Sequence, residues 1–406
     1  MIREKNVSIL KRVYLGNSFP ETVLKQTQRR DYELFKLLNS MLCTFVLVHC
    51  LGFQTTAQDR SVRYKIESPL ETQASFNKIQ QKSNKPIMVA YMPPATEFNY
   101  YLDIGKGIRS VCSVTGDKSF MFAPQSDNPS EQMKMIQEVI RQKVDAIILS
   151  THDPKSAASY VKRAVDQGIL VLIVNSDTPR FSTPVHAVVG YIQRAGTHKI
   201  GRYILEILGG NEKVKVGVIE GAPGYHSTER VGGFLDAIKE TNFKVVSSLN
   251  GKWNTEGGNM AALKMFKAHP DISVVFAAND FEIIGAVSAL KTLKINNVFL
   301  LGNDGDPAAF ERIADGRITA TVNTDPVLIG QVAMQVVVDS IRGKFKGGFV
   351  ETPTVIVDKK NLQQYWSPPI SVEGDNFNEI FLVTEALPDL TNKDGSGLYL
   401  DILKEI

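Results

Sequence analysis

The sequence predicts an α/β fold made of two doubly wound lobes, and three observations support this prediction. From residue 85 onward, short apolar runs rich in Val, Ile or Phe alternate with segments of helical periodicity. Most of these runs are continuously apolar, as a strand buried on both faces of a parallel sheet requires. About nine such strands are too many for one comfortable sheet, so we expect them to divide between two lobes.

The strands and helices alternate along the chain, which is the order that βαβ units require. We expect strands at residues 87–92, 119–122, 145–149, 170–174, 187–189, 214–219, 244–247, 273–277 and 298–301. We expect helices between most of them, at residues 131–142, 155–167, 197–208, 229–241, 260–268 and 283–293. The folded core therefore covers about residues 85–365.

Composition excludes several classes of protein. The 406 residues are enough for two or three domains, and 43% of them are apolar, so a sizeable core can form. Lys and Arg number 46 against 43 Asp and Glu, a net charge of +3 that gives no reason to expect nucleic acid as a partner. Three cysteines are too few for a disulfide scaffold or for a zinc site made of four thiolates.

The N-terminal region contains a segment typical of export. Residues 41–53 read MLCTFVLVHCLGF, with basic residues before them and small residues after them up to Ala57. This apolar stretch is shorter than the ~20 residues of a membrane-spanning helix. We interpret residues 1–57 as a signal peptide cleaved after Ala57 or as an uncleaved anchor through residues 35–53. A buried core helix is the alternative. The polar residues 58–84 are expected to form a linker with a short helix.

Polar residues follow four of the apolar runs. They are Asn175-Ser176-Asp177, Asn279-Asp280, Asn303-Asp304 and Asn323-Thr324. Ligands of open parallel sheets bind beyond the carboxyl ends of the strands, where these residues are expected to lie. Amides and carboxylates match the hydroxyl groups of a sugar. Helix N-capping is the alternative at each position, but four such corners in one chain favour a shared polar cleft.

The motifs of the common enzyme classes are missing from the sequence. No GxxxxGK[ST] phosphate loop occurs, because the GAPG at residues 221–224 lacks the Lys and the Ser or Thr. None of the six histidines lies in an HExxH motif, and no GxSxG nucleophile elbow is found. We therefore expect no catalytic activity, no cofactor and no metal site.

Five blocks of sequence carry a resemblance to a known family. They begin KPIMVAYM, SEQMKMIQEVIRQKVDAIILS, ERVGGF, AHPDISVVFAAND and FLLGNDGDPAAF. Over residues 86–364 the chain resembles the type 1 periplasmic binding proteins, in particular the ribose- and galactose-binding group of sugar ABC transporters. The resemblance implies a periplasmic location and two Rossmann-like lobes joined by three hinge crossovers near residues 190, 324 and 353. Lobe 1 is then residues 85–189 plus 325–353, and lobe 2 is residues 190–324 plus 354–364.

The resemblance implies, residue by residue, which side chains of this chain contact the ring of the sugar and which bind its hydroxyl groups. Tyr100 and Tyr101 match the aromatic pair that lies against the sugar ring, and Trp253 matches an aromatic that closes the opposite face. Arg230 matches an arginine whose guanidinium donates hydrogen bonds to sugar hydroxyls. Asp304 would accept hydrogen bonds from hydroxyls on the other side of the ring. The alternatives are a salt bridge between lobes for the charged pair and core packing for the aromatics.

The remaining assignments include three departures from the ribose group. Asn279 matches an amide that follows a strand of the second lobe. Thr324 stands where the ribose group has an amide side chain, Asn175 where many sugar binders have an aspartate, and the residue after Asn175 where the ribose group has an arginine. Asp177 would supply the missing carboxylate. The departures argue against ribose itself. Replacing Arg230 or Asp304 by alanine is expected to abolish ligand-dependent stabilisation and to leave the ligand-free fold intact.

The implied function is extracytoplasmic binding of a small sugar or sugar-like ligand by hinge closure, followed by delivery to an ABC transporter permease. A transcription repressor with the same core is disfavoured because residues 1–60 hold an apolar stretch where a DNA-reading helix pair would be needed. Residues 365–406 form a C-terminal extension similar to the opening of a second binding-protein domain, or an amphipathic helix packed on the core. The extension leaves open an alternative, a sensory ligand-binding module of a membrane receptor or two-component system.

Overall fold

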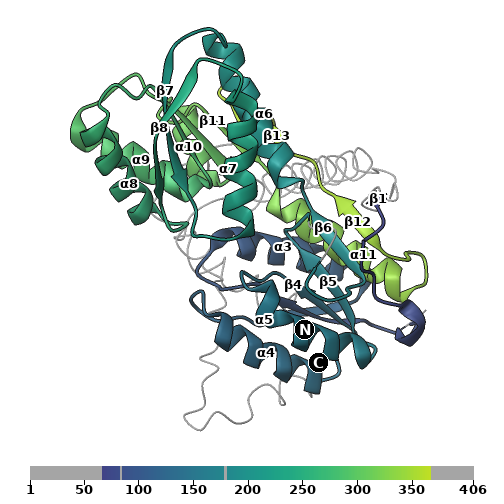
Figure 1. Cartoon of the computed structure of the whole chain (residues 1–406). Helices are drawn as coiled ribbons and strands as arrows, with labels where there is room; N and C mark the ends of the chain where they lie inside the picture. The colour runs from purple at the N-terminus through teal and green to yellow at the C-terminus, as the bar shows by residue number, and fades with distance from the viewer. Residues whose placement is uncertain (1–65, 83–84, 178–180, 367–406) are drawn as a thin grey trace, which may run out of the picture. The chain divides into compact units, whose positions relative to one another are not determined.

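The computed structural model of the chain describes residues 66–82, 85–177 and 181–366 (Figure 1). All of these residues belong to one compact unit, Tyr64–Ile406. The predicted signal peptide or anchor and residues 367–406 of the C-terminal extension lie outside the described residues. Among the described residues, none of the helices combines the length and the apolar character needed to cross a membrane.

The first lobe is built on a seven-stranded sheet with the order β1-β12-β6-β5-β4-β2-β3, in which only β1 runs antiparallel to its neighbour. Its strands are β1 (Ile66–Ser68), β2 (Met88–Met92), β3 (Lys118–Met121), β4 (Ala146–Leu149), β5 (Leu170–Val174), β6 (Ala187–Gly190) and β12 (Gly348–Glu351). Its helices are α3 (Asn99–Thr115), α4 (Pro129–Arg141), α5 (Pro154–Asp166) and α11 (Pro326–Ile341), with a short 3-10 helix at Phe76–Lys78. Helices α3 and α11 pack together, and so do α4 and α5.

The second lobe is built on a six-stranded sheet with the order β13-β11-β10-β9-β7-β8, parallel except for β13. Its strands are β7 (Val214–Glu220), β8 (Phe243–Asn250), β9 (Val274–Ala277), β10 (Phe299–Asp304), β11 (Ala320–Asn323) and β13 (Val355–Asp358). Its helices are α6 (Gln193–Leu208), α7 (Tyr225–Ile238), α8 (Thr255–Ala268), α9 (Asp280–Leu293) and α10 (Pro307–Ala314), with a 3-10 helix at Leu362–Gln364.

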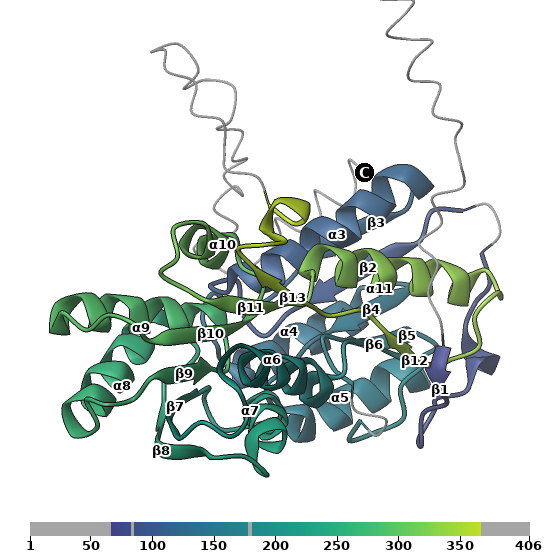
Figure 2. The same ribbon diagram turned by 90° about the horizontal axis from the view of Figure 1, so that it is seen from above.

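The apolar strands have helices on both faces, as the sequence predicts. In β9, Val274 and Phe276 pack into a core with α6 and α7, whereas Val275 and Ala277 pack into a separate core with α8, α9 and α10. Successive side chains of a strand point to opposite faces, so a continuously apolar strand serves both cores. Figure 2 shows α6 and α7 on one side of this sheet and α8 and α9 on the other.

The chain passes between the two sheets three times. It crosses after β6 at residues 191–192, after β11 at residues 324–325 and after β12 at residues 352–354. These segments coincide with the three crossovers expected near residues 190, 324 and 353. The predicted fold class, two doubly wound α/β lobes joined by three crossovers, is therefore confirmed.

Residues 66–82 differ from the linker that their polar composition predicts. Ile66–Ser68 form strand β1 against β12, and the Gln73 side chain donates a 2.6 Å hydrogen bond to the Lys346 carbonyl. Leu70 and Ala74 are buried. Hydrogen bonds between backbones do not depend on which amino acids a strand contains, so composition does not reveal β1. Two isolated buried apolar residues are too few to give the sequence of this segment a strand or helix periodicity. The segment is therefore part of the first lobe.

Helices α3 and α11 were not among the helices expected from periodicity, although they pack tightly against each other. A Cβ atom at Gly107 would lie 2.0 Å from the carbonyl oxygen of Val327, and one at Gly330 would lie 2.0 Å from that of Ile104. Glycine at both positions lets the two backbones approach closely. Ten of the 16 residues of α11 are buried and the other six are partly buried, so apolar residues occupy most of its faces and it shows little amphipathic period.

Candidate ligand-binding site

A pocket lies between the two lobes, at the carboxyl ends of the strands. Seven of the nine predicted site residues line this pocket, namely Tyr100, Tyr101, Asn175, Arg230, Trp253, Asn279 and Asp304. The other residues in its wall are Phe98, His152, His226 and Phe281. We refer to this cavity, of about 50 Å³, as the inner pocket. The polar corners of separate strands thus converge on one place, as expected for parallel sheets.

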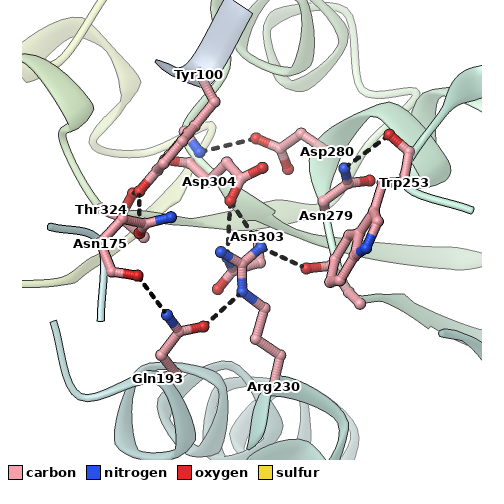
Figure 3. A network of polar contacts seen from close by, with 12 residues as sticks. Tyr100, Asn175, Gln193, Arg230, Trp253, Asn279, Asp280, Asn303, Asp304 and Thr324 are labelled. Atoms are coloured by element: carbon pink, nitrogen blue, oxygen red, sulfur yellow. Dashed lines mark hydrogen bonds and ion pairs between the residues drawn. The ribbon is translucent and has the colours of Figure 1, made fainter. Parts of the chain in front are cut away.

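A buried ion pair, Arg230 with Asp304, is part of the lining of the inner pocket, and Figure 3 shows its polar contacts. The Arg230 Nη1 atom donates to Asp304 Oδ1 at 2.9 Å and to the Ala278 carbonyl at 3.0 Å, and Nε donates to Gln193 Oε1 at 3.0 Å. Arg230 is 4% exposed and Asp304 is 6% exposed. Both belong to the second lobe, on α7 and at the end of β10, so the pair is not the salt bridge between lobes considered as an alternative.

Burial dominates the electrostatics of the acidic side chains here. It raises the pKa of Asp304 to about 6, although the Arg230 guanidinium opposes this rise. Burial and the nearby charge of Asp304 raise the pKa of Asp280 to about 8. Asp280 lies behind the pocket, where it accepts hydrogen bonds from the backbone N–H groups of Gly305 and Asp306, each at 2.8 Å. The Arg230 guanidinium therefore favours the carboxylate form of Asp304, against the effect of burial.

The Trp253 ring is held in a fixed position over Arg230. The guanidinium carbon lies 5.5 Å from the centre of the Trp253 ring, a distance typical of a cation–π contact. The Trp253 backbone has a φ of 61°, and its N–H donates to Glu282 Oε1 at 2.8 Å. A Cβ atom at Gly221 would meet the indole at 2.2 Å, so only glycine leaves room for this ring. The ring therefore reaches the pocket through a constrained loop.

Two tyrosines form the wall on the side of the first lobe. The Tyr100 hydroxyl donates to Asn175 Oδ1 at 3.1 Å and lies 3.0 Å from Thr324 Oγ1. Tyr101 packs edge-on against Tyr100, with ring centres 5.7 Å apart. Asn175 has a φ of 58° and donates from Nδ2 to the Tyr101 hydroxyl at 3.4 Å. The two aromatic rings and the amide are thus parts of one hydrogen-bonded wall.

Asp177 and Thr324 do not line the inner pocket, although both were predicted to. Asp177 accepts from the Gln193 N–H at 2.9 Å and from the Tyr225 hydroxyl at 2.8 Å, so its carboxylate joins the first lobe to α6 and α7. Burial raises its pKa. Thr324 is fully buried at a crossover, donates to the Asp304 carbonyl at 3.0 Å and reaches the pocket only through Tyr100.

Asn279 combines the two roles that the sequence left open. Its Oδ1 atom accepts from the Glu282 N–H at 2.9 Å and caps α9, while its Nδ2 atom donates to the Trp253 carbonyl at 3.2 Å. The capping interpretation therefore holds for its oxygen, and the residue still lines the pocket.

Gln193 is a central residue of the site that sequence reasoning missed. It is fully buried at the first crossover, accepts from Arg230 Nε and donates from Nε2 to the Asn175 carbonyl at 3.4 Å. It thereby links the charged pair of one lobe to the polar corner of the other. Nothing in the sequence around it distinguishes it from an ordinary residue of a helix start.

A scan against protein families matches residues 89–345 to the periplasmic binding protein domain. A D-ribose/D-allose-binding protein of Pseudomonas aeruginosa is 32% identical over 241 residues, which are 56% of this chain and 74% of that protein. A ribose import binding protein of Bacillus subtilis is 26% identical over 64% of this chain and 84% of its own length.

Solved structures agree with the fold. A solute-binding protein of an ABC transporter from Burkholderia graminis, crystallised with D-arabinose, aligns with a TM-score of 0.66 and 25% identity. The alignment covers 70% of this chain and all of that protein.

Proposed function

Because this chain belongs to the periplasmic binding protein family, we propose that it binds a small neutral sugar or sugar-like polyol in the inner pocket. It is a binding protein and not an enzyme. The ligand would be captured by closure of the two lobes around the three crossovers and then delivered to the permease of an ABC transporter.

The observation that carries the proposal is the meeting of an aromatic ring and a charged pair in one pocket. Sugar rings have apolar C–H faces, which aromatic side chains cover, and polar edges, which charged groups and amides bind. Trp253 and Tyr100 come from different lobes and supply the ring surfaces, while Arg230 and Asp304 supply charged partners for hydroxyl groups. Asn175 and Asn279 would add amide donors and acceptors.

Contacts between the lobes support closure as the mechanism. The Tyr225 hydroxyl on α7 donates to Asp177 in the first lobe at 2.8 Å, and Tyr100 meets Thr324 at the second crossover. Asp177 and Thr324 would therefore affect ligand affinity by stabilising the closed arrangement of the lobes, without touching the ligand themselves. Tyr225 and Asp177 belong to different lobes, so we expect their hydrogen bond to break when the lobes part.

A thermal-shift screen tests the proposal. Pentoses, hexoses and inositols are added singly to the full chain, to Asp304→Asn and to a matched control, Asp315→Asn, whose aspartate is exposed outside the pocket. A hydrogen bond to a charged group contributes about 1.5–3 kcal/mol, so loss of the Asp304 charge should weaken binding about 10- to 100-fold. We expect at least one sugar to raise the melting temperatures of the parent and the control by similar amounts, and that of Asp304→Asn by clearly less. Equal shifts in all three proteins would contradict the site.

The partner and the location are part of the proposal. Relatives named as import binding proteins support an exported protein that serves a permease. A sensory module of a membrane receptor is the second candidate, and it rests on the N- and C-terminal segments outside the described residues. Uptake of the radiolabelled sugar should fall when the gene is deleted if the protein serves transport, whereas a sensor would alter transcription and leave uptake unchanged.

A further inference from the structure

A second and larger cavity adjoins the inner pocket. This outer cavity has a volume of about 440 Å³ and lies between the loops that follow β4 and β5 and the start of α7. Its wall shares His152, Asn175, His226 and Trp253 with the inner pocket. The two cavities are therefore neighbours with a common boundary, and a ligand held by Trp253 faces both.

The sizes of the two cavities point to a ligand larger than one ring. A water molecule needs about 10–15 Å³ of such space, so the inner pocket of about 50 Å³ has room for only a few waters, and a sugar ring held against Trp253 must also take up space in the outer cavity. The outer cavity lies within the range of about 300–1,000 Å³ that is usual for pockets of small molecules. Resting on the proposed function, we propose that the ligand is a neutral glycoside or disaccharide, with one ring against Trp253 where the two cavities meet and the second group in the outer cavity.

The chemistry of the outer wall fits an uncharged second group. Phe181 and Pro223 supply apolar surface, and Thr151 and Tyr225 supply hydroxyl groups. Among the described residues of this wall there is no Lys or Arg, and the one carboxylate, Asp127, lies 2.8 Å from His152 Nδ1. A second sugar ring would find both apolar and hydroxyl surfaces on these residues.

The boundary between the cavities holds an unpartnered polar atom. The Nδ1 atom of His226 is buried and has no hydrogen-bond partner, and its ring centre lies 6.2 Å from that of His152 in the opposite lobe. Burial lowers the pKa of His226 well below its usual value, so the imidazole is neutral. Buried polar atoms nearly always have a partner. An oxygen on the bond between two sugar units, or a hydroxyl beside it, would lie at this boundary.

Isothermal titration of the full chain with matched probes tests the inference. Free D-ribose, D-allose, D-arabinose, D-galactose and D-glucose are compared with their methyl and phenyl glycosides in both anomeric forms, and with disaccharides that carry the same sugars. We expect at least one phenyl glycoside or disaccharide to bind ten-fold or more tightly than its free sugar. If a free sugar binds and none of its larger derivatives binds ten-fold more tightly than it does, the inference is wrong and the proposed function stands. If no compound of either kind binds, both are wrong.

A variant that fills the outer cavity provides the second arm. Ala222 lines the outer cavity but not the inner pocket, so Ala222→Phe should remove the ten-fold gain of the larger ligand and change affinity for the free sugar less than two-fold. Ala268→Phe, at an exposed position at the end of α8, is the matched control and should keep the gain. An undiminished gain in Ala222→Phe would place the second group elsewhere and overturn the inference. The titration of the parent decides the matter even if this variant does not fold.

Discussion

Replacing Arg230 by alanine should destabilise the protein even without a ligand. The guanidinium bonds in the ligand-free chain to Asp304, to the Ala278 carbonyl and to Gln193, all at 2.9–3.0 Å. Its removal leaves the Asp304 carboxyl buried without its cation, a change that costs about 3–5 kcal/mol for a buried ion pair. The structure therefore revises the expectation that this substitution would leave the ligand-free fold intact.

The same reasoning predicts the stability of the variant that combines Arg230→Ala with Asp304→Asn. Asp304→Asn removes the negative charge but keeps an oxygen that can accept from Arg230, so it should cost less than Arg230→Ala. Combining the two substitutions leaves no buried charge in the pair, so the double variant should lose less than the sum of the two single losses. We expect a coupling free energy of at least about 1 kcal/mol between these residues.

Urea denaturation followed by circular dichroism measures these differences at pH 7 without sugar. Arg317→Ala is the matched control, because Arg317 forms an exposed pair with Asp315 and its loss should change stability by less than about 1 kcal/mol. An Arg230→Ala midpoint equal to that of the parent, or strict additivity in the double variant, would refute the description of Arg230 and Asp304 as one buried pair.

Three further predictions concern other parts of the chain. Burial lowers the pKa of His186 to about 4, so the folded state keeps it neutral while the unfolded state takes up a proton below about 6.5. The free energy of unfolding should therefore fall as the pH drops from 6.5 towards 4, by roughly 2 kcal/mol at pH 5. The urea midpoints at pH 7 and pH 5 should differ less in His186→Gln than in the parent, and an equal difference would show that His186 is not the titrating group. Tyr100→Phe removes the hydroxyl that forms hydrogen bonds with Asn175 and Thr324, so the ligand-free protein should lose about 1 kcal/mol of stability. The sugar-dependent rise in melting temperature should also become smaller, and an unchanged rise would show that the Tyr100 hydroxyl does not contribute to the site. Gly330→Ala should force α3 and α11 apart at a cost of about 1–3 kcal/mol, visible as a lower melting temperature, and an unchanged value would show that the helices can separate freely.

The sheets and the location of the site could be predicted because strong local signals specify them. Strands such as Leu170–Val174 are continuously apolar, and a strand buried on both faces has almost no other solution. Asn175 follows β5 and Asp304 is the last residue of β10, so the topology brings each of them to the carboxyl edge of its own sheet. The prediction of a shared cleft therefore needed only the order of strands and the residues after them.

The orientation of individual side chains could not be predicted in the same way. Asp177 is two residues beyond Asn175, yet its carboxylate bonds to Gln193 and Tyr225 instead of lining the inner pocket. Gln193 bonds to Arg230, 37 positions away, because the first crossover brings the start of α6 beside α7. Such contacts depend on how three separate segments meet, and no short-range pattern in the sequence records that.

Tryptophan fluorescence of a single-tryptophan variant tests whether the ligand binds against the Trp253 ring. The chain has two tryptophans, and Trp366→Phe leaves Trp253 in the inner pocket as the sole reporter. A sugar or glycoside that raises the melting temperature should also change the Trp253 emission, with a saturable curve that gives the same Kd as titration calorimetry. A ligand that stabilises the protein while the Trp253 emission stays constant through saturation would contradict binding against this ring.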